Sequence, residues 1–253
     1  MTDPHFLDKT ALVTGSGAGI GRASARAFAA RGARVMVCDI NLADAEETAA
    51  QIHAAGGQAE AMRVDATDDA AVQQLVKATL DRFGSLDFAH NNVGCGVGKP
   101  VEELTPADYD FVIDVTFKSV YLGLRYQLPV MRERGGGAIV NTASMAGVST
   151  VQSSDIVYSG AKAGVIHMTA HAARGYAQHN IRVNCIAPGL VATKVISEMF
   201  TPEQQVALAG DQLFKRPIRP EEIAATVTFL CSAEAAMITG IMVPVDGGLN
   251  VNS

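Results

Sequence analysis

Hydrophobic residues follow two alternating patterns along this chain. Short apolar runs, such as TALVTG (10–15) and ARVMVCD (33–39), have the length and the β-branched content of buried strands. Between them lies IGRASARAFAARG (20–32), whose apolar residues recur at the spacing of a helix and which ends at a glycine. The pattern therefore predicts a strand, a helix and a second strand in succession.

The same alternation continues to the end of the chain. We expect further strands at 58–65, 86–92, 137–144, 181–189 and 241–248, and helices at 41–57, 68–83, 105–133, 156–179 and 219–233. Parallel strands need crossover connections, so this order predicts an α/β fold: a doubly wound, Rossmann-type parallel sheet of about seven strands with helices on both faces. No linker interrupts the pattern, and we expect one domain over 1–253. The weakest pattern, at 190–217, predicts a substrate loop.

Composition and charge narrow the class of protein. The 253 residues are 48% hydrophobic and 18% charged, which suits a large core, and the net charge of −6 argues against a nucleic-acid partner. No apolar run has the length of a membrane span and the N-terminus does not resemble a signal peptide, so we expect a soluble, cytoplasmic protein without a membrane partner. The four cysteines lie far apart in the sequence and are expected to be reduced. His167 and His171 lack a nearby carboxylate, and no metal site is expected.

A glycine-rich turn follows the first strand. TGSGAGIG (14–21) has glycines at 15, 17, 19 and 21 and fits no register of G-x-G-x-x-G. Glycines let the backbone approach a pyrophosphate, and the following helix offers unpaired N–H groups and a positive dipole end. The turn predicts a dinucleotide site, with an ordinary tight turn as the alternative.

An acid ends the second strand. Asp39 has the separation from the glycine loop expected for a carboxylate that binds the adenosine ribose hydroxyls. Such a carboxylate repels the extra phosphate of NADP, and neither Ala18 nor Ile40 supplies a compensating cation. These residues favour NAD as the cofactor, and the alternative is an aspartate that caps the next helix.

A tyrosine and a lysine lie one helical turn apart. In VYSGAKAGVIHMTA (157–170), Tyr158 and Lys162 are expected on the same helix face. Tyrosine ionises near pH ~10, and a nearby lysine cation favours the phenolate. The pair is a candidate proton-transfer device, although a half-buried tyrosine beside the aliphatic stem of a lysine fits the same spacing.

Five motifs in this order resemble those of the short-chain dehydrogenase/reductase family, single-domain type, from about Lys9 to Gly248. TGSGAGIG matches the T-G-x-x-x-G-x-G cofactor loop, NNVG (91–94) resembles N-N-A-G, IVNTAS (139–144) leads to a serine, YSGAK (158–162) is Y-x-x-x-K, and NCIAPG (184–189) resembles N-x-x-x-P-G. The resemblance implies an oxidoreductase that acts on the CH–OH group of its donors with a nicotinamide cofactor. It also implies a homotetramer, with 105–133, 156–179 and the C-terminus at interfaces.

The resemblance implies a role for each matching residue. Tyr158 would be the general acid/base, Lys162 would lower its pKa and bind the nicotinamide ribose, and Ser144 would hydrogen-bond the substrate oxygen. The residues implied in cofactor binding are Gly15, Ser16, Gly17, Gly19, Ile20 and Gly21 in the loop, Asp39 and Ile40 at the ribose, Asp65 and Ala66 at the adenine, Asn91 and Gly94 along the cleft, Tyr158 and Lys162, and Pro188, Gly189, Val191 and Thr193 at the nicotinamide.

One position departs from the family pattern. In DVTFKSVYLG (114–123), Thr116 stands where the family normally carries an asparagine that holds a water in a proton relay with the lysine. The threonine hydroxyl is shorter than the amide, so we expect Thr116 to support catalysis through a weakened relay. The alternative is a catalytically weak NAD-binding regulatory protein.

The expected substrate pocket draws on 95–99, 145–155 and 190–217. Its expected apolar side chains are Val97, Met145, Val148, Val151, Ile196, Met199, Phe200 and Leu213, with a hydrogen bond from Gln152 or Ser153. They predict a mainly apolar secondary alcohol or its ketone as the small-molecule substrate. An NADP-dependent 3-ketoacyl-type reductase is the runner-up, disfavoured by Asp39. A purely structural subunit would not need Ser144, Tyr158 and Lys162 together.

Overall fold

The computed structural model describes residues 6–150, 154–193 and 200–252 and contains one sheet of seven parallel strands. The strands are β1 (Thr10–Thr14), β2 (Arg34–Asp39), β3 (Gln58–Arg63), β4 (Phe88–Asn91), β5 (Gly137–Thr142), β6 (Ile181–Pro188) and β7 (Met242–Val245). Their order in the sheet is β3-β2-β1-β4-β5-β6-β7. The predicted doubly wound parallel sheet is confirmed.

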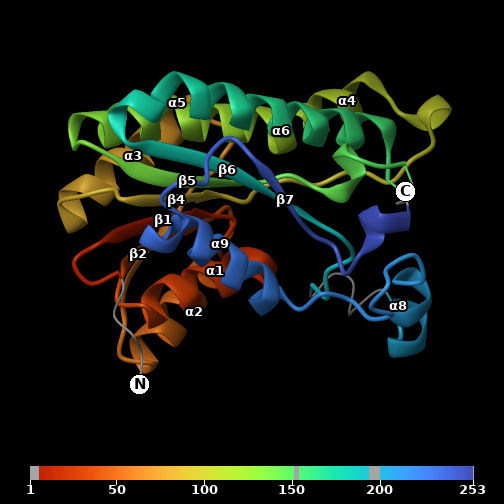
Figure 1. Ribbon diagram of the computed structural model, residues 1–253, viewed down its shortest axis with the longest axis horizontal. Helices are drawn as coiled ribbons and strands as arrows, with labels where there is room; N and C mark the ends of the chain where they lie inside the picture. The colour runs from red at the N-terminus through yellow and green to blue at the C-terminus, as the bar shows by residue number, and fades with distance from the viewer. Residues whose placement is uncertain (1–5, 151–153, 194–199, 253) are drawn as a thin grey trace.

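Two layers of helices enclose the sheet (Figure 1). One face carries α1 (Gly19–Ala30), α2 (Leu42–Ala54) and α9 (Pro220–Cys231), and the other carries α3 (Asp69–Phe83), α4 (Pro106–Ile113), α5 (Ser119–Glu133) and α6 (Ile156–Tyr176). The short helix α8 (Pro202–Leu208) lies beyond the ends of the strands, near the C-terminus.

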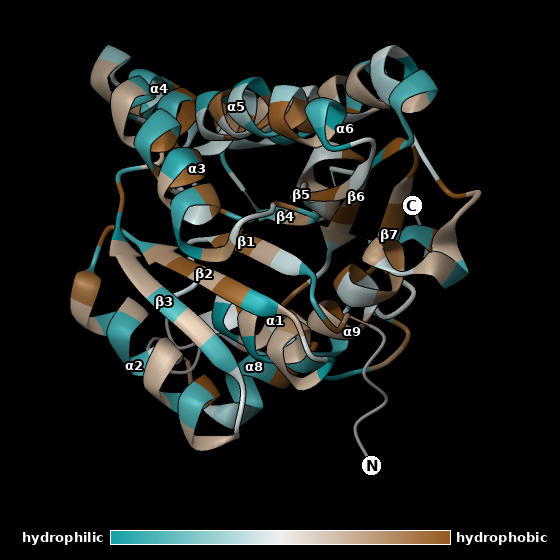
Figure 2. Ribbon diagram, turned by 90° about the vertical axis from the view of Figure 1, so that its left-hand side faces the viewer, coloured by the Kyte–Doolittle hydropathy of each residue, from teal (hydrophilic) through white to brown (hydrophobic). Residues whose placement is uncertain are grey.

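Alternate residues of each strand supply two separate cores. In β1, Ala11 and Val13 pack against α1 and α9, whereas Leu12 faces the opposite layer. On the first side Phe28 of α1 stacks on Phe88 of β4, with ring centroids 5.8 Å apart. Hydrophilic residues colour the outer turns of α2 and α3 (Figure 2). Burial on both faces explains why the strands are nearly continuous apolar runs in the sequence.

The chain changes direction in the sheet between β1 and β4. After β3 it crosses back, so the carboxyl ends of β1 and β4 lie side by side. In doubly wound sheets such a switch point opens a crevice at the carboxyl ends of the strands. Here the Asn92 backbone N–H donates to Thr14 Oγ1 over 3.0 Å, which joins the two strand ends. The glycine loop and the motif at 91–94 therefore meet at this edge.

Two predicted segments differ from the structure. The expected continuous helix at 105–133 is interrupted by a turn of π-helix at Asp114–Lys118. In this turn a backbone N–H bonds to the carbonyl oxygen five residues earlier, as Ser119 does to Asp114, rather than four. The expected irregular segment at 190–217 contains α8, which begins with a capping box of Thr201 and Gln204. Within the described part of the chain, no helix combines the length and the apolar character needed to cross a membrane.

Candidate active site

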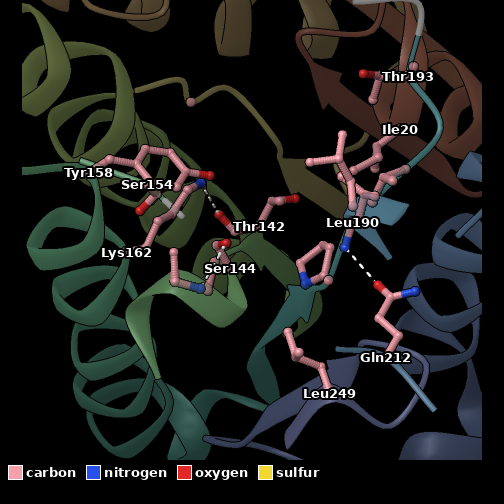
Figure 3. A pocket seen from close by; sticks show the side chains of 18 of the residues that line it. Ile20, Thr142, Ser144, Ser154, Tyr158, Lys162, Leu190, Thr193, Gln212 and Leu249 are labelled. Atoms are coloured by element: carbon pink, nitrogen blue, oxygen red, sulfur yellow. Dashed lines mark hydrogen bonds between the residues drawn. The ribbon is translucent and has the colours of Figure 1, made fainter. Parts of the chain in front are cut away.

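A cavity of about 730 Å³ opens at the carboxyl ends of the strands. Ser144 enters it from the end of β5, and Tyr158 and Lys162 enter from the first two turns of α6 (Figure 3). Ser144 Oγ accepts a hydrogen bond from the Ala146 backbone N–H over 3.1 Å. Lys162 Nζ donates to the Thr142 carbonyl oxygen over 2.6 Å. The structure thus brings three of the four predicted catalytic side chains, Ser144, Tyr158 and Lys162, to one wall.

Burial dominates the titration of the tyrosine and the lysine. It raises the pKa of Tyr158 to about 12, and a hydrogen bond with Ser144 opposes that rise. Burial also lowers the pKa of Lys162 from 10.5 to about 8. The lysine ammonium lies 5.5 Å from the centroid of the tyrosine ring. In the protein alone, desolvation therefore moves the Tyr158 pKa opposite to the direction expected from the lysine.

Thr116 sits in the π-turn, fully buried. Its hydroxyl donates to the Cys95 carbonyl oxygen over 3.0 Å and accepts from the Cys95 backbone N–H over 3.2 Å. A Cβ at Gly94 would lie 2.8 Å from Lys162 Nζ, so a larger residue there would displace the ammonium. Thr116 therefore anchors the loop that follows β4, and its hydroxyl is occupied by that loop rather than directed at Lys162.

The glycine loop offers an anion site between β1 and α1. The first turn of α1 has no side-chain cap and no acidic residue, whereas Asn41, Asp68 and Thr105 cap α2, α3 and α4. A Cβ at Gly21 would collide with the Gly15 carbonyl oxygen, so the loop can fold this tightly only with glycine there. The uncapped first-turn N–H groups fit the pyrophosphate of a dinucleotide.

Asp39 lies beside this loop. Its Oδ2 accepts from the Gly17 backbone N–H over 2.9 Å, and its Oδ1 accepts from that of Asn41 over 3.0 Å. Arg22 of α1, which is not among the predicted site residues, also reaches the loop through a hydrogen bond to the Gly17 carbonyl oxygen. Its guanidinium is paired with Glu47 of α2 over 3.0 Å. The Arg22 guanidinium beside the glycine loop is therefore already paired with the Glu47 carboxylate.

A second cavity, of about 260 Å³, adjoins the loop on the side of β2 and β3. It is lined by Gly15, Asp39, Ile40, Asp65 and Ala66 among the predicted residues, together with Thr14, Cys38, Val64, Thr67, Val93, Phe111 and Val115. The Asp65 carboxylate accepts from the backbone and hydroxyl of Thr67, which fixes the turn after β3. The apolar walls of this second cavity, with the Asp65 carboxylate at its border, suit an adenosine group.

Two predicted cofactor residues point elsewhere. The Asn91 side chain is 2% exposed and bonds to Gln127 and Asn141 inside the protein, because its place in β4 directs it between α5 and β5. Its neighbour Asn92 lines the larger cavity instead. The Ser16 hydroxyl is also buried and bonds to the carbonyl oxygens of Val13 and Cys38, joining β1 to β2. Both side chains are therefore engaged inside the protein, and neither residue lines the larger cavity.

The opposite wall of the larger cavity comes from the end of β6 and the segments after it (Figure 3). The predicted residues Gly19, Ile20, Gly94, Pro188, Gly189, Val191 and Thr193 all line this cavity. Gln212, 2% exposed, accepts at Oε1 from the Leu190 backbone N–H over 2.9 Å. Leu249, near the C-terminus, also lines the cavity. The residues around Leu249, GGLNVN (247–252), give no local signal of this contact.

The substrate end differs from the prediction. Its apolar lining comes from Ala146, Leu190, Ala207, Leu208 and Leu249, with Ser154 and Asp211 as polar members. Met145 does not line the cavity; it is fully buried in a cluster with Ala187 and Leu249. Val97, Val148, Phe200 and Leu213 do not line it, and Val151, Gln152, Ser153, Ile196 and Met199 lie outside the described residues.

Among the residues that the structure describes, no three His, Cys, Asp or Glu side chains gather as a metal site. His167 and His171 are exposed on α6, with ring centroids 5.3 Å apart. His90 is fully buried in β4, and its Nε2 bonds to Thr142 Oγ1 over 2.9 Å. Burial lowers the His90 pKa to about 3, so this ring stays neutral.

Comparison with known proteins identifies the family. A family model described as enoyl-(acyl carrier protein) reductase matches residues 15–250. The chain is 36% identical over 254 residues to levodione reductase from Leifsonia aquatica, covering 96% of this chain and 95% of that protein. It is 39% identical over 243 residues to cyclohexanol dehydrogenase from Acinetobacter sp. (strain SE19), again covering 96% and 95%.

A solved structure agrees with these sequences. The crystallised 7α-hydroxysteroid dehydrogenase in complex with NADH and 7-oxo glycochenodeoxycholic acid superposes with a TM-score of 0.91 and 33% identity, covering 98% of this chain and 97% of that one. The motifs, the fold and these relatives agree over nearly the whole chain. The chain belongs to the short-chain dehydrogenase/reductase family of oxidoreductases.

Proposed function

We propose that the protein is an NAD-dependent oxidoreductase that interconverts a mainly apolar, alicyclic secondary alcohol and its ketone, with Tyr158 as general acid/base. The observation that carries the proposal is the convergence of Ser144, Tyr158 and Lys162 on one cavity wall, opposite the glycine loop. Relatives named for cyclohexanol and levodione support an alicyclic substrate. The apolar side chains that line the cavity, such as Leu190, Leu208 and Leu249, support an alicyclic substrate as well.

The residues present fit an NAD molecule. The uncapped turn of α1 would hold the pyrophosphate, Asp39 the adenosine ribose, and Lys162 the nicotinamide ribose. When bound, NAD accepts or returns the hydride. Asp39 supports NAD over NADP because its carboxylate repels a ribose phosphate and Glu47 already pairs with Arg22.

The side chains of the wall would handle the proton and the oxygen. In alcohol oxidation the ionised phenolate of Tyr158 takes the hydroxyl proton and becomes the phenol, and in ketone reduction the phenol gives its proton to the oxygen. The Ser144 hydroxyl donates a hydrogen bond to the same oxygen as negative charge develops on it. Burial raises the Tyr158 pKa to about 12 in the protein alone, so the neutral phenol is the resting form. The positive charge of a bound oxidised nicotinamide ring near the phenol would favour its ionisation.

Absorbance at 340 nm tests the function. Purified protein is mixed with NAD or NADP and with cyclohexanol, substituted cyclohexanols and linear secondary alcohols. We expect NADH to form from alicyclic alcohols, faster with NAD than with NADP. Reduction of 3-ketoacyl thioesters with NADPH alone would support the runner-up enzyme. NAD binding without turnover on any alcohol or ketone would support the regulatory alternative.

A further inference from the structure

The start of α6 carries a buried carboxylate that the proposed reaction does not use. Asp155 is 3% exposed and precedes Tyr158 by one helical turn. Its Oδ1 accepts a hydrogen bond from the Tyr158 backbone N–H over 2.7 Å, which caps the helix. Its Oδ2 accepts from the backbone N–H groups of Val97 and Gly98 over 2.8 and 3.1 Å. One carboxylate thus joins α6 to the loop at 95–98.

This loop lies directly on the tyrosine. A Cβ at Gly96 would lie 2.5 Å from Asp155 Oδ2 and 3.1 Å from Tyr158 Cβ, so the glycine backbone and the tyrosine are in contact. At the start of the loop, Thr116 holds both backbone polar groups of Cys95. The loop is therefore fixed at one end by the π-turn and at the other by Asp155.

The charged and titratable groups around the tyrosine ring come from α6, with its cap Asp155, and from the loop at 95–98. Lys162, one turn further along α6, has its ammonium 5.5 Å from the ring centroid. The Cys95 thiol from the loop and the Asp155 carboxylate both oppose ionisation and raise the Tyr158 pKa, after burial, which is the main cause. The Asp155 carboxylate therefore acts on Tyr158 in two ways. It holds the loop that packs on the tyrosine, and its negative charge opposes ionisation of the phenol.

We propose that Asp155 is a positioning residue. It fixes the loop at 95–98 against Tyr158 and thereby determines the position of the tyrosine and the groups that lie around its side chain. The inference rests on the proposed role of Tyr158 in proton transfer. Asp155 does not reach the substrate. It acts through the backbone of Val97, Gly98 and Tyr158.

Replacement of the carboxylate by a short hydroxyl separates its two structural tasks. In Asp155→Ser the hydroxyl still caps α6, but it is too short to reach Val97 and Gly98. The matched control is Asp68→Ser, because Asp68 caps α3 in the same way, accepting from the Ala71 backbone N–H over 2.7 Å. The substrate is the best alcohol of the 340 nm panel.

In Asp155→Ser we expect kcat/KM to fall on the order of tenfold or more, because small displacements of a reacting group are costly. We also expect the rise of kcat/KM with pH, in the oxidation direction, to move to lower pH by roughly half a unit, because a nearby anion has been removed. The backbone amides of Val97 and Gly98 should exchange faster with deuterium. Asp68→Ser should change none of the three.

Equal kcat/KM and equal pH profiles in Asp155→Ser and Asp68→Ser would overturn the proposal. If Asp155→Ser does not fold, Asp155→Asn keeps the size of the side chain and removes its charge, and the same comparison applies. If the wild type oxidises no alcohol, the proposed function fails but the positioning role is still tested. Deuterium exchange reports the loop, and phenolate absorbance, with Tyr158→Phe subtracted, reports the Tyr158 pKa in a chain without tryptophan. An unchanged exchange rate and an unchanged pKa would then overturn it.

Discussion

Lys162 is a buried ammonium whose position serves the site at the expense of stability. The side chain is 1% exposed, and its described hydrogen bond goes to the neutral Thr142 carbonyl oxygen. Burial of a cation without a compensating anion is unfavourable, which is the reason for the lowered pKa. A residue that costs stability in this way is typical of a functional site.

Lys162→Met should therefore abolish turnover and stabilise the fold. The pKa is 10.5 in the reference state and about 8 in the folded protein, so between these values the unfolded chain binds more protons and wild-type stability rises with pH. Below pH 8 the wild type bears the full cost of the buried charge. We expect the variant to be more stable by roughly 1–3 kcal/mol at pH 7, with a smaller difference at pH 10. Thermal unfolding at both pH values measures this, and a variant less stable than wild type at pH 7 contradicts it.

Thr116 should matter through its hydroxyl. Thr116→Val keeps the shape of the side chain but leaves the Cys95 N–H and C=O without their partner. We expect a loss of about 1–3 kcal/mol in unfolding free energy and a lower kcat, because the loop beside Lys162 is released. Thr116→Ser, which keeps the hydroxyl, should retain most of both. Denaturant unfolding and 340 nm assays check this, and equal behaviour of the two variants would argue against the hydroxyl.

At the scale of elements, the order of strands and helices was predictable from the sequence. Strands that are buried on both faces have continuous apolar sequences. TALVTG and GAIVNTAS, for example, correspond to β1 and β5. The π-turn at Asp114–Lys118 was not predictable, because an insertion of one residue in a helical turn barely alters the apolar spacing. Within this turn, Thr116 bonds to Cys95, a residue distant in sequence.

The candidate site was predicted where the motif and the strand end coincide. Ser144, Tyr158 and Lys162 line the cavity as expected from the resemblance. The direction of a side chain at a strand end depends on the register, and a shift of one residue exchanges Asn91 for Asn92. Leu249 reaches the cavity from a segment remote in the chain, a contact that only the folded structure reveals.

The end of β2 should decide the choice of cofactor. Asp39→Ala removes the carboxylate beside the glycine loop and with it the repulsion of a ribose phosphate. We expect NAD affinity to weaken on the order of tenfold, the effect of losing hydrogen bonds to a charged group, while NADP affinity is retained or improves. Dissociation constants for both cofactors measure the ratio. An unchanged ratio would refute the ribose assignment.

At the scale of the whole molecule, several of the exposed apolar side chains lie in two separate regions. Tyr109 and Tyr121 lie on α4 and α5, and Met237 and Ile241 lie next to β7. Two such regions permit a closed assembly of identical chains, and we propose the homotetramer that the family resemblance implies. Light scattering after size-exclusion chromatography should give four times the mass of the chain. A monomer at micromolar concentration would contradict this.

The same scale relates the site to its scaffold. The two cores lie between the sheet and the helical layers, whereas the cavity lies at the carboxyl ends of the strands. Changes at the cavity wall that leave apolar packing and buried charge unaltered are therefore expected to change chemistry with little effect on the cores. Tyr158→Phe is the smallest such change, because it removes one oxygen atom.

The measurement that tests the central claim most directly compares wild type and Tyr158→Phe with NAD and an alicyclic alcohol, following NADH at 340 nm and NAD affinity by calorimetry. Loss of the acid/base should lower kcat by roughly 10²–10⁴-fold, while NAD affinity stays within about twofold. Equal turnover by the two proteins would contradict the assignment of Tyr158 as the group that transfers the proton.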